Sequence, residues 1–228
     1  GTHVSRPKAS ANPADLGKQD AVIVTVKAPA LPSVAAGIAP LLGPDTPVAF
    51  VMNGIPWWYF HAHGGKWDGR RVAQVDPGDA MWRAVGPGRA VGSVIYSACT
   101  LVEPDVVSVA NRRNRIILGE PDGRLSARVA AIAAPLRAGG LAVDETPRIR
   151  DVRWEKLLGI LQDLELGRPM EIDGIYDAAL ALARLAGVAT PELDRLVALV
   201  NVRARQAGLY PGAAARAQFT SAMVGHPA

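Results

Sequence analysis

The hydrophobic pattern places two short apolar runs in the first quarter of the chain. Val48 to Met52 runs without polar interruption and stops at Asn53, and an earlier run from Ala21 to Val26 stops at Lys27. A short continuous apolar run is typical of a strand buried on both faces, as in a parallel sheet. Between the two runs, apolar residues recur at helical spacing from Pro32 to Leu42. The pattern predicts strand, helix and strand in one right-handed crossover, with Lys27 and Asn53 at the same edge of the sheet.

The rest of the pattern separates a sheet region from a helical region. Further strands are predicted at 91–98, 106–109, 116–118 and 141–143, with a helix at 126–138. After residue 152 only helical spacing remains, and the last helix is predicted to begin with Thr190 as its N-cap and Pro191 at its first position. Residues 144–150 are polar and contain a proline. We therefore predict an α/β fold with one domain at 1–147 and an all-helical domain at 148–228.

Composition narrows the class of protein. Hydrophobic residues make up 49% of the 228 and charged residues 20%, which is typical of a folded globular protein. No apolar run approaches the ~20 residues of a membrane span, and no secretory signal opens the chain, so no membrane partner is expected. The single cysteine, Cys99, cannot form an internal disulfide, which fits a cytoplasmic protein. The net charge of +4 is scattered, so no nucleic-acid partner is expected either.

Three motifs look like binding sites but give little evidence for one. The glycines of Gly86–Gly92 miss the spacing of a dinucleotide-binding loop, and Pro87 removes a backbone donor, so this segment is predicted to be a turn. His61 and His63 have no companion carboxylate or cysteine at ligand spacing, so no metal is expected. The aromatic run Trp57–Phe60 fits equally a wall over a site and an ordinary packed loop.

Five motifs together resemble the ketopantoate reductase (2-dehydropantoate 2-reductase) family: Asp20–Lys27, Met52–Pro56, Trp154–Leu157, Gln162–Asp173 and Gly187–Pro191. Each is weak alone, but in this order over residues 20–203 they are specific. The resemblance implies an N-terminal Rossmann-type parallel sheet domain, incomplete in this chain, a helical C-terminal domain, and an active site in the cleft between them. It also implies NADPH-dependent reduction of ketopantoate, a small 2-oxo acid, to pantoate, on the route to pantothenate and coenzyme A.

The resemblance also implies roles for five residues. Lys156 would be the general acid, and Lys27 and Asn53 would line the cofactor cleft, with Asn53 close to the nicotinamide and the substrate. Glu171 would hydrogen-bond hydroxyls of the cofactor or the substrate. Ala98 would offer a backbone contact to the cofactor.

Each polar residue of this set also has an ordinary explanation. Lys156 could be a helix lysine whose ammonium reaches water, and Glu171 an acid in the first turn of a helix. Asn53 could belong to a turn after a strand, and Lys27 could be a solvated strand end. Only the joint match favours an enzyme. Two other functions stay open, a non-catalytic nucleotide-binding relative and a reductase of another 2-oxo acid. The choice between NADPH and NADH and the oligomeric state also stay open, with a homodimer as one option.

The chain departs from the family pattern in two places. No strand with a glycine fingerprint comes before the first predicted strand, and Ile160 runs directly into Leu161 where the family has further helices and a substrate-binding serine. We expect segments of a longer protein to be missing. In that case the Cα atoms of Ile160 and Leu161 would lie farther apart than the ~3.8 Å of a trans peptide.

Overall fold

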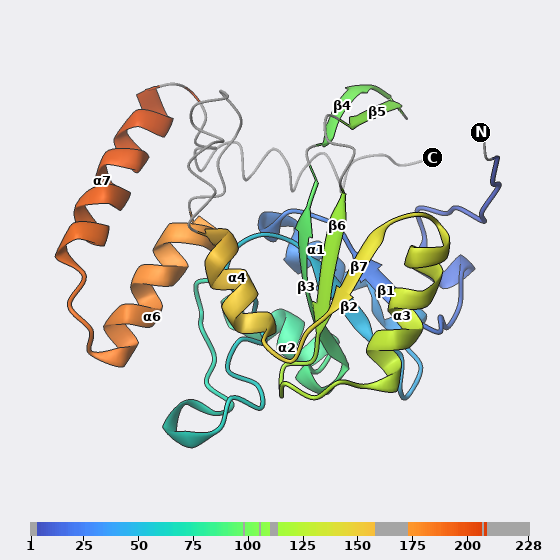
Figure 1. Ribbon diagram of the computed structural model, residues 1–228, viewed down its shortest axis with the longest axis horizontal. Helices are drawn as coiled ribbons and strands as arrows, with labels where there is room; N and C mark the ends of the chain where they lie inside the picture. The colour runs from blue at the N-terminus through green and yellow to red at the C-terminus, as the bar shows by residue number, and fades with distance from the viewer. Residues whose placement is uncertain are drawn as a thin grey trace.

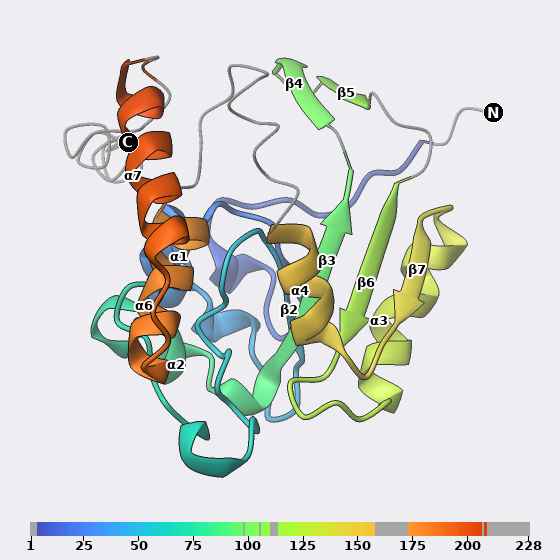
Figure 2. The same ribbon diagram turned by 60° about the vertical axis from the view of Figure 1, so that its left-hand side comes forward.

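The computed structural model describes residues 4–97, 99–104, 106–109, 114–157, 173–206 and 208. Ala98, Glu171 and the Ile160–Leu161 junction lie outside these ranges, so their predicted roles stay predictions. A five-stranded sheet in the order β1-β2-β3-β6-β7 carries helices on both faces, and α6 and α7 lie to one side of it (Figures 1 and 2). The strands are β1 Val22–Val24, β2 Val48–Val51, β3 Ala90–Tyr96, β4 Cys99–Glu103, β5 Val106–Val109, β6 Arg115–Gly119 and β7 Ala142–Glu145. The helices are α1 Leu31–Gly37, α2 Ala80–Ala84, α3 Ala127–Ala138, α4 Ile149–Leu157, α6 Ala178–Ala186 and α7 Pro191–Gln206.

The crossover predicted at the start of the chain is present. β1 and β2 are parallel, with Val22 opposite Val48, and α1 connects them. α1 is shorter than predicted, since a 3₁₀ turn at Ala39–Leu41 contains Pro40, which has no N–H to continue the helix. β2 is buried as expected, but β1 lies at the edge of the sheet and Ile23 is 42% exposed. The prediction of burial on both faces was therefore wrong for β1.

The sheet is not wholly parallel. β3 runs parallel to β2, but β6 runs antiparallel to β3, with Gly92 opposite Gly119. The reason is the hairpin β4–β5, a separate two-stranded sheet between β3 and β6 that returns the chain in the opposite direction (Figure 1). The sequence pattern did not predict β4. Within the described ranges the last strand, β7, ends at Glu145 and only helices follow, as predicted.

Three hydrophobic clusters hold these layers together. One face of the sheet packs on α1, α2 and the start of α4, and the other face packs on α3. A third cluster joins α6 and α7 to the segment 55–72. The aromatic run connects two of these clusters, because Trp57 and Trp58 are buried against the sheet and Tyr59 and Phe60 are buried against the helices. It is a packed loop, one of the two alternatives that the sequence allowed.

Two glycines let α4 approach the sheet closely. Gly92 and Gly119 face each other on β3 and β6. A Cβ atom built on Gly92 would lie 2.7 Å from Ile149 Cγ1 and 2.8 Å from a ring carbon of Trp58. The first turn of α4 and the buried indole of Trp58 therefore occupy the space that a side chain would need.

We expect Gly92→Ala to lower the free energy of unfolding by ~1–3 kcal/mol, because overpacking a buried site forces its neighbours to move. Gly88→Ala is the matched control, since a Cβ atom there would meet nothing within 4 Å. Urea unfolding of the two variants and the parent protein checks this. Equal stability of the two variants would contradict the close packing of α4.

Candidate functional site at the carboxyl edge of the sheet

The carboxyl ends of β1, β2 and β3 form one edge of the sheet. Because the three strands are parallel neighbours, the residues that follow them lie at this same edge. Lys27 follows β1 and opens a 3₁₀ turn at Ala28–Ala30, and Asn53 follows β2. Gly54 has a φ of 82°, a left-handed conformation that glycine adopts without strain, and it turns the chain sharply after the strand.

Helix α4 brings a third predicted residue to this edge. The Lys156 ammonium donates a hydrogen bond to the carbonyl of Ile95, near the end of β3. Its Nζ also lies 5.3 Å from the centre of the Tyr96 ring. Burial and the nearby carboxylate of Glu155 raise the pKa of Tyr96, so its hydroxyl stays protonated beside the lysine. Lys156 is half-buried at the sheet edge.

Two arginines of α4 hold the helix in this position, and sequence reasoning missed both. Arg150 donates to the carbonyls of Tyr59 at 2.8 Å and His61 at 2.7 Å, and also to that of Pro121. Arg153 is buried and donates to three carbonyls, those of Met52 and Gly54 just after β2 and that of Ser93 within β3. Burial lowers the pKa of both guanidinium groups, and that of Arg153 falls to about 10, so both remain charged at neutral pH. Their spacing of three residues was the available signal, since it places them on one helix face.

The side chains at this edge have the charge and the hydrogen-bonding groups that an anionic nucleotide requires. Lys27 is exposed, and no carboxylate of the described residues pairs with it, so its ammonium is available to an anion. Asn53, which follows the neighbouring strand at the same edge, has both an amide donor and a carbonyl acceptor in its side chain. In open α/β sheets, ligands bind outside the carboxyl ends of the strands.

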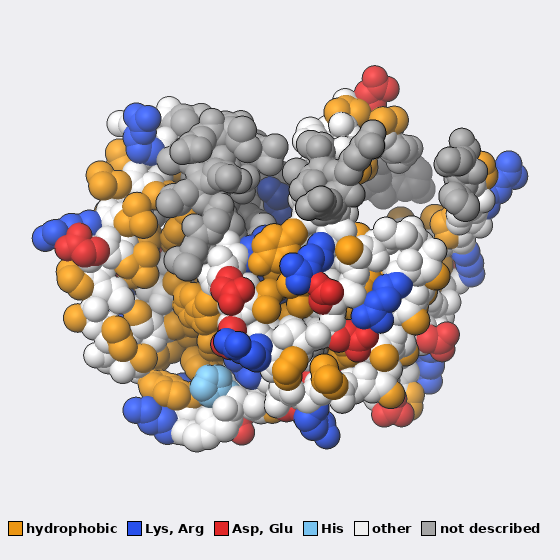
Figure 3. Space-filling view, viewed as in Figure 1, with side chains coloured by type: hydrophobic (Ala, Val, Ile, Leu, Met, Phe, Trp, Pro, Cys, Tyr) orange, Lys and Arg blue, Asp and Glu red, His pale blue; other side chains and the backbone are white. Residues whose placement is uncertain are grey.

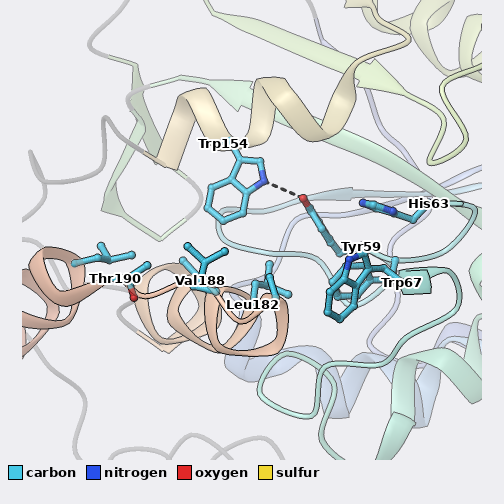
Figure 4. Close-up of a pocket in the computed structure, with 12 residues that line it drawn as sticks. Tyr59, His63, Trp67, Trp154, Leu182, Val188 and Thr190 are labelled. Atoms are coloured by element: carbon cyan, nitrogen blue, oxygen red, sulfur yellow. Dashed lines mark hydrogen bonds between the residues drawn. The ribbon is translucent and has the colours of Figure 1, made fainter. Parts of the chain in front are cut away.

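A separate apolar pocket of about 430 Å³ lies between the aromatic loop and helices α6 and α7. Tyr59, Trp67 and Trp154 line one side, and the Trp154 indole donates to the Tyr59 hydroxyl at 2.9 Å (Figure 4). Leu182 and Val188 line the other side. Hydrophobic side chains also gather on the surface over α6 and α7, whereas charged side chains of both signs are interspersed over α4 and the sheet (Figure 3). None of the described residues that line the pocket is a lysine or an arginine, so we place the candidate site at the sheet edge.

The structure thus brings Lys27, Asn53 and Lys156 to one edge of the sheet, although Lys27 and Lys156 are more than 120 positions apart in the chain.

Among the described residues, no group of three histidine, cysteine or acidic side chains could hold a metal ion. Burial lowers the pKa of His61, which therefore stays neutral in its packed loop. In the described part of the chain, no helix is long and apolar enough to cross a membrane.

A mostly parallel sheet with polar residues at its carboxyl edge, followed by helices, defines a Rossmann-type α/β protein. Residues 1–57 match the family model described as ketopantoate reductase PanE/ApbA, and residues 159–204 match that of its C-terminal region. A 2-dehydropantoate 2-reductase of Mesorhizobium japonicum is 33% identical, over 89% of this chain and 82% of the relative. The chain therefore belongs to the ketopantoate reductase family.

Solved structures agree with this assignment. A protein of Ralstonia solanacearum MolK2 assigned as a ketopantoate reductase is 32% identical, with a TM-score of 0.82 over 92% of this chain and 84% of the other. D-mandelate dehydrogenase, solved with NADH and anilino(oxo)acetate, shares the fold at 18% identity, with a TM-score of 0.61 over 84% of this chain and 78% of the other.

The alignment with the Mesorhizobium protein extends over 269 residues, more than the 228 of this chain. That relative therefore has internal residues with no counterpart here, in line with the expected missing segments.

Proposed function

We propose that this protein reduces 2-dehydropantoate to pantoate with NADPH as the hydride donor. One observation carries the proposal: in a chain 33% identical to a 2-dehydropantoate 2-reductase, Lys156 is bound at the same sheet edge as Lys27 and Asn53. A bound reduced pyridine nucleotide would supply a hydride. Lys27 and Asn53 would hold that cofactor, Lys27 through the charge of its ammonium and Asn53 through its amide. Glu171 and the backbone of Ala98 remain part of the proposed binding set.

Lys156 has the chemistry that the reduction requires. Negative charge develops on the oxygen of the 2-oxo group, and a positioned ammonium both stabilises that charge and donates a proton to it. The contact between Lys156 and the Ile95 carbonyl supports this role over that of a lysine extended into water. A carbonyl acceptor holds the Nζ atom at the edge, and an ammonium carries three protons that it can donate.

The division of labour between the two parts of the chain is also a proposal. Residues 1–147 would bind the nucleotide, and 148–228 would contribute the general acid and help to bind the substrate. In support, α4 carries Lys156 onto the sheet edge, and α6 and α7 share a hydrophobic cluster with the segment that follows β2.

A steady-state assay with the purified full-length protein tests the function. We expect ketopantoate to oxidise NADPH with saturable kinetics, and NADH to give a kcat/KM lower by at least ~10-fold, which corresponds to ~1.4 kcal/mol of lost transition-state stabilisation. Nucleotide binding without turnover of any 2-oxo acid would instead support a non-catalytic relative. A higher kcat/KM for a different 2-oxo acid would support a reductase with another substrate.

A further inference from the structure

Arg153 is a buried cation, and no carboxylate in the described part of the chain pairs with it. Its side chain is only 2% exposed, and its Nη1 donates to the carbonyls of Met52 and Gly54, both at 2.9 Å. Its Nη2 donates to the carbonyl of Ser93 at 2.8 Å. Its Nε has no hydrogen-bond partner, and none of the carboxylates in the described ranges contacts the guanidinium. The guanidinium carbon also lies 5.8 Å from the centre of the Trp58 ring.

Stability alone does not explain an arginine at this position. Burying a charge costs free energy, and an apolar side chain of similar volume is often as stable or more so. A guanidinium has one property that an apolar side chain lacks, a rigid planar fork that can hold several carbonyl oxygens at fixed angles. The three oxygens that Arg153 holds come from the turn that follows β2 and from the adjacent strand β3.

These carbonyls belong to the two segments that carry the candidate site. Met52 and Gly54 are the residues on either side of Asn53, so Arg153 fixes the backbone of that turn. Ser93 lies two residues before Ile95, whose carbonyl accepts from Lys156. Arg153 and Lys156 lie three residues apart, on one face of α4. The arginine therefore joins the helix that carries Lys156 to the turn that carries Asn53.

We propose that Arg153 is a positioning residue that fixes Asn53 and Lys156 relative to each other for the reduction. This inference rests on the proposed function. Because Arg153 is buried, it acts through the backbone of residues 52–54 and through α4, and it touches neither substrate nor cofactor. A shift of about 1 Å between a catalytic group and its partner can cost a large factor in rate, so the fixed geometry has a direct kinetic consequence.

Arg150 provides a matched control on the same helix. It also donates to backbone carbonyls of the segment after β2, but at Tyr59 and His61, away from the turn at 52–54. If α4 needed only attachment to the body of the protein, removal of either arginine would have the same effect. If Arg153 positions the site, its removal should affect turnover selectively.

The experiment compares Arg153→Met with Arg150→Met in the full-length protein. We expect Arg153→Met to lower kcat for ketopantoate by ~10-fold with little change in NADPH affinity, and Arg150→Met to change kcat by less than ~3-fold. Amide hydrogen exchange should accelerate at residues 52–54 only in the Arg153 variant. Arg153→Lys, which keeps the charge but lacks the fork, should show the same two effects, and it replaces the methionine variant if that one does not fold.

Equal losses of kcat in the Arg153 and Arg150 variants, or unchanged exchange at residues 52–54, would overturn the inference. Failure of the proposed function looks different, since the parent protein would then show no turnover of ketopantoate. In that case the exchange measurement alone decides whether Arg153 holds the turn.

Discussion

Lys156→Ala is expected to lower kcat by ~10²–10⁴, the usual contribution of a positioned acid, while NADPH affinity changes little. The physical reason is that the ammonium interacts most strongly with charge that exists only in the transition state. Loss of such an interaction lowers kcat and kcat/KM together. Steady-state kinetics with ketopantoate, together with a fluorescence titration with NADPH, checks both parts of the expectation.

Glu155→Ala is the matched control for this variant. Glu155 is the adjacent residue on α4 and is exposed, so its replacement tests whether a change in the helix itself affects turnover. We expect a kcat close to that of the parent protein. Near-normal turnover in Lys156→Ala would refute the role of general acid, and a lysine that serves only to attach α4 to Ile95 would then be the better interpretation.

Asn53→Asp is expected to lower kcat/KM by ~10²-fold. The change is nearly isosteric, but it replaces an amide that donates hydrogen bonds with a carboxylate that only accepts them. The 2-oxo acid is itself an anion, and two like charges 4 Å apart repel by ~4 kcal/mol at an effective dielectric constant of 20. Because Asn53 is half-buried at an open edge, we expect part of this repulsion to be screened.

Two comparisons separate charge from loss of the amide. Asn53→Ala removes the hydrogen bonds without adding charge and should lower kcat/KM by only ~10-fold. Raised ionic strength should recover part of the activity of the aspartate variant and none of that of the alanine variant. If the two variants lost the same activity at every salt concentration, Asn53 would not lie near the anionic substrate.

Much of the sheet edge could be predicted from the local pattern of hydrophobic and polar residues. The apolar run at 48–51 and the polar residue after it sufficed to predict β2 and the place of Asn53, because a buried strand leaves a continuous hydrophobic signal. The predicted cap at Thr190 and Pro191 also agrees with the start of α7. Along this helix Val197 and Val200 are buried, whereas Leu196 is 38% exposed.

The direction of β6 could not be predicted in the same way. Its sequence is apolar in either direction, and whether it runs parallel or antiparallel depends on the connection before it. That connection contains β4 and β5, whose side chains are exposed and so show no pattern of burial. The roles of Ala98 and Glu171 stay predictions, as does the division into domains at residue 147.

The sequence by itself determined the family, the elements with a clear hydrophobic period, and three residues with the right chemistry, Lys27, Asn53 and Lys156. Their chemistry is local, because an ammonium or an amide has the same donors wherever it lies. Only the tertiary structure decided that Arg150 attaches α4 to the loop after β2 and that Arg153 attaches it to the turn at residues 52–54 and to β3. The carbonyls that Arg153 reaches lie 60 to 101 positions away in the chain. Backbone carbonyls are the same in every residue, so no side-chain pattern could have indicated which of them an arginine would reach.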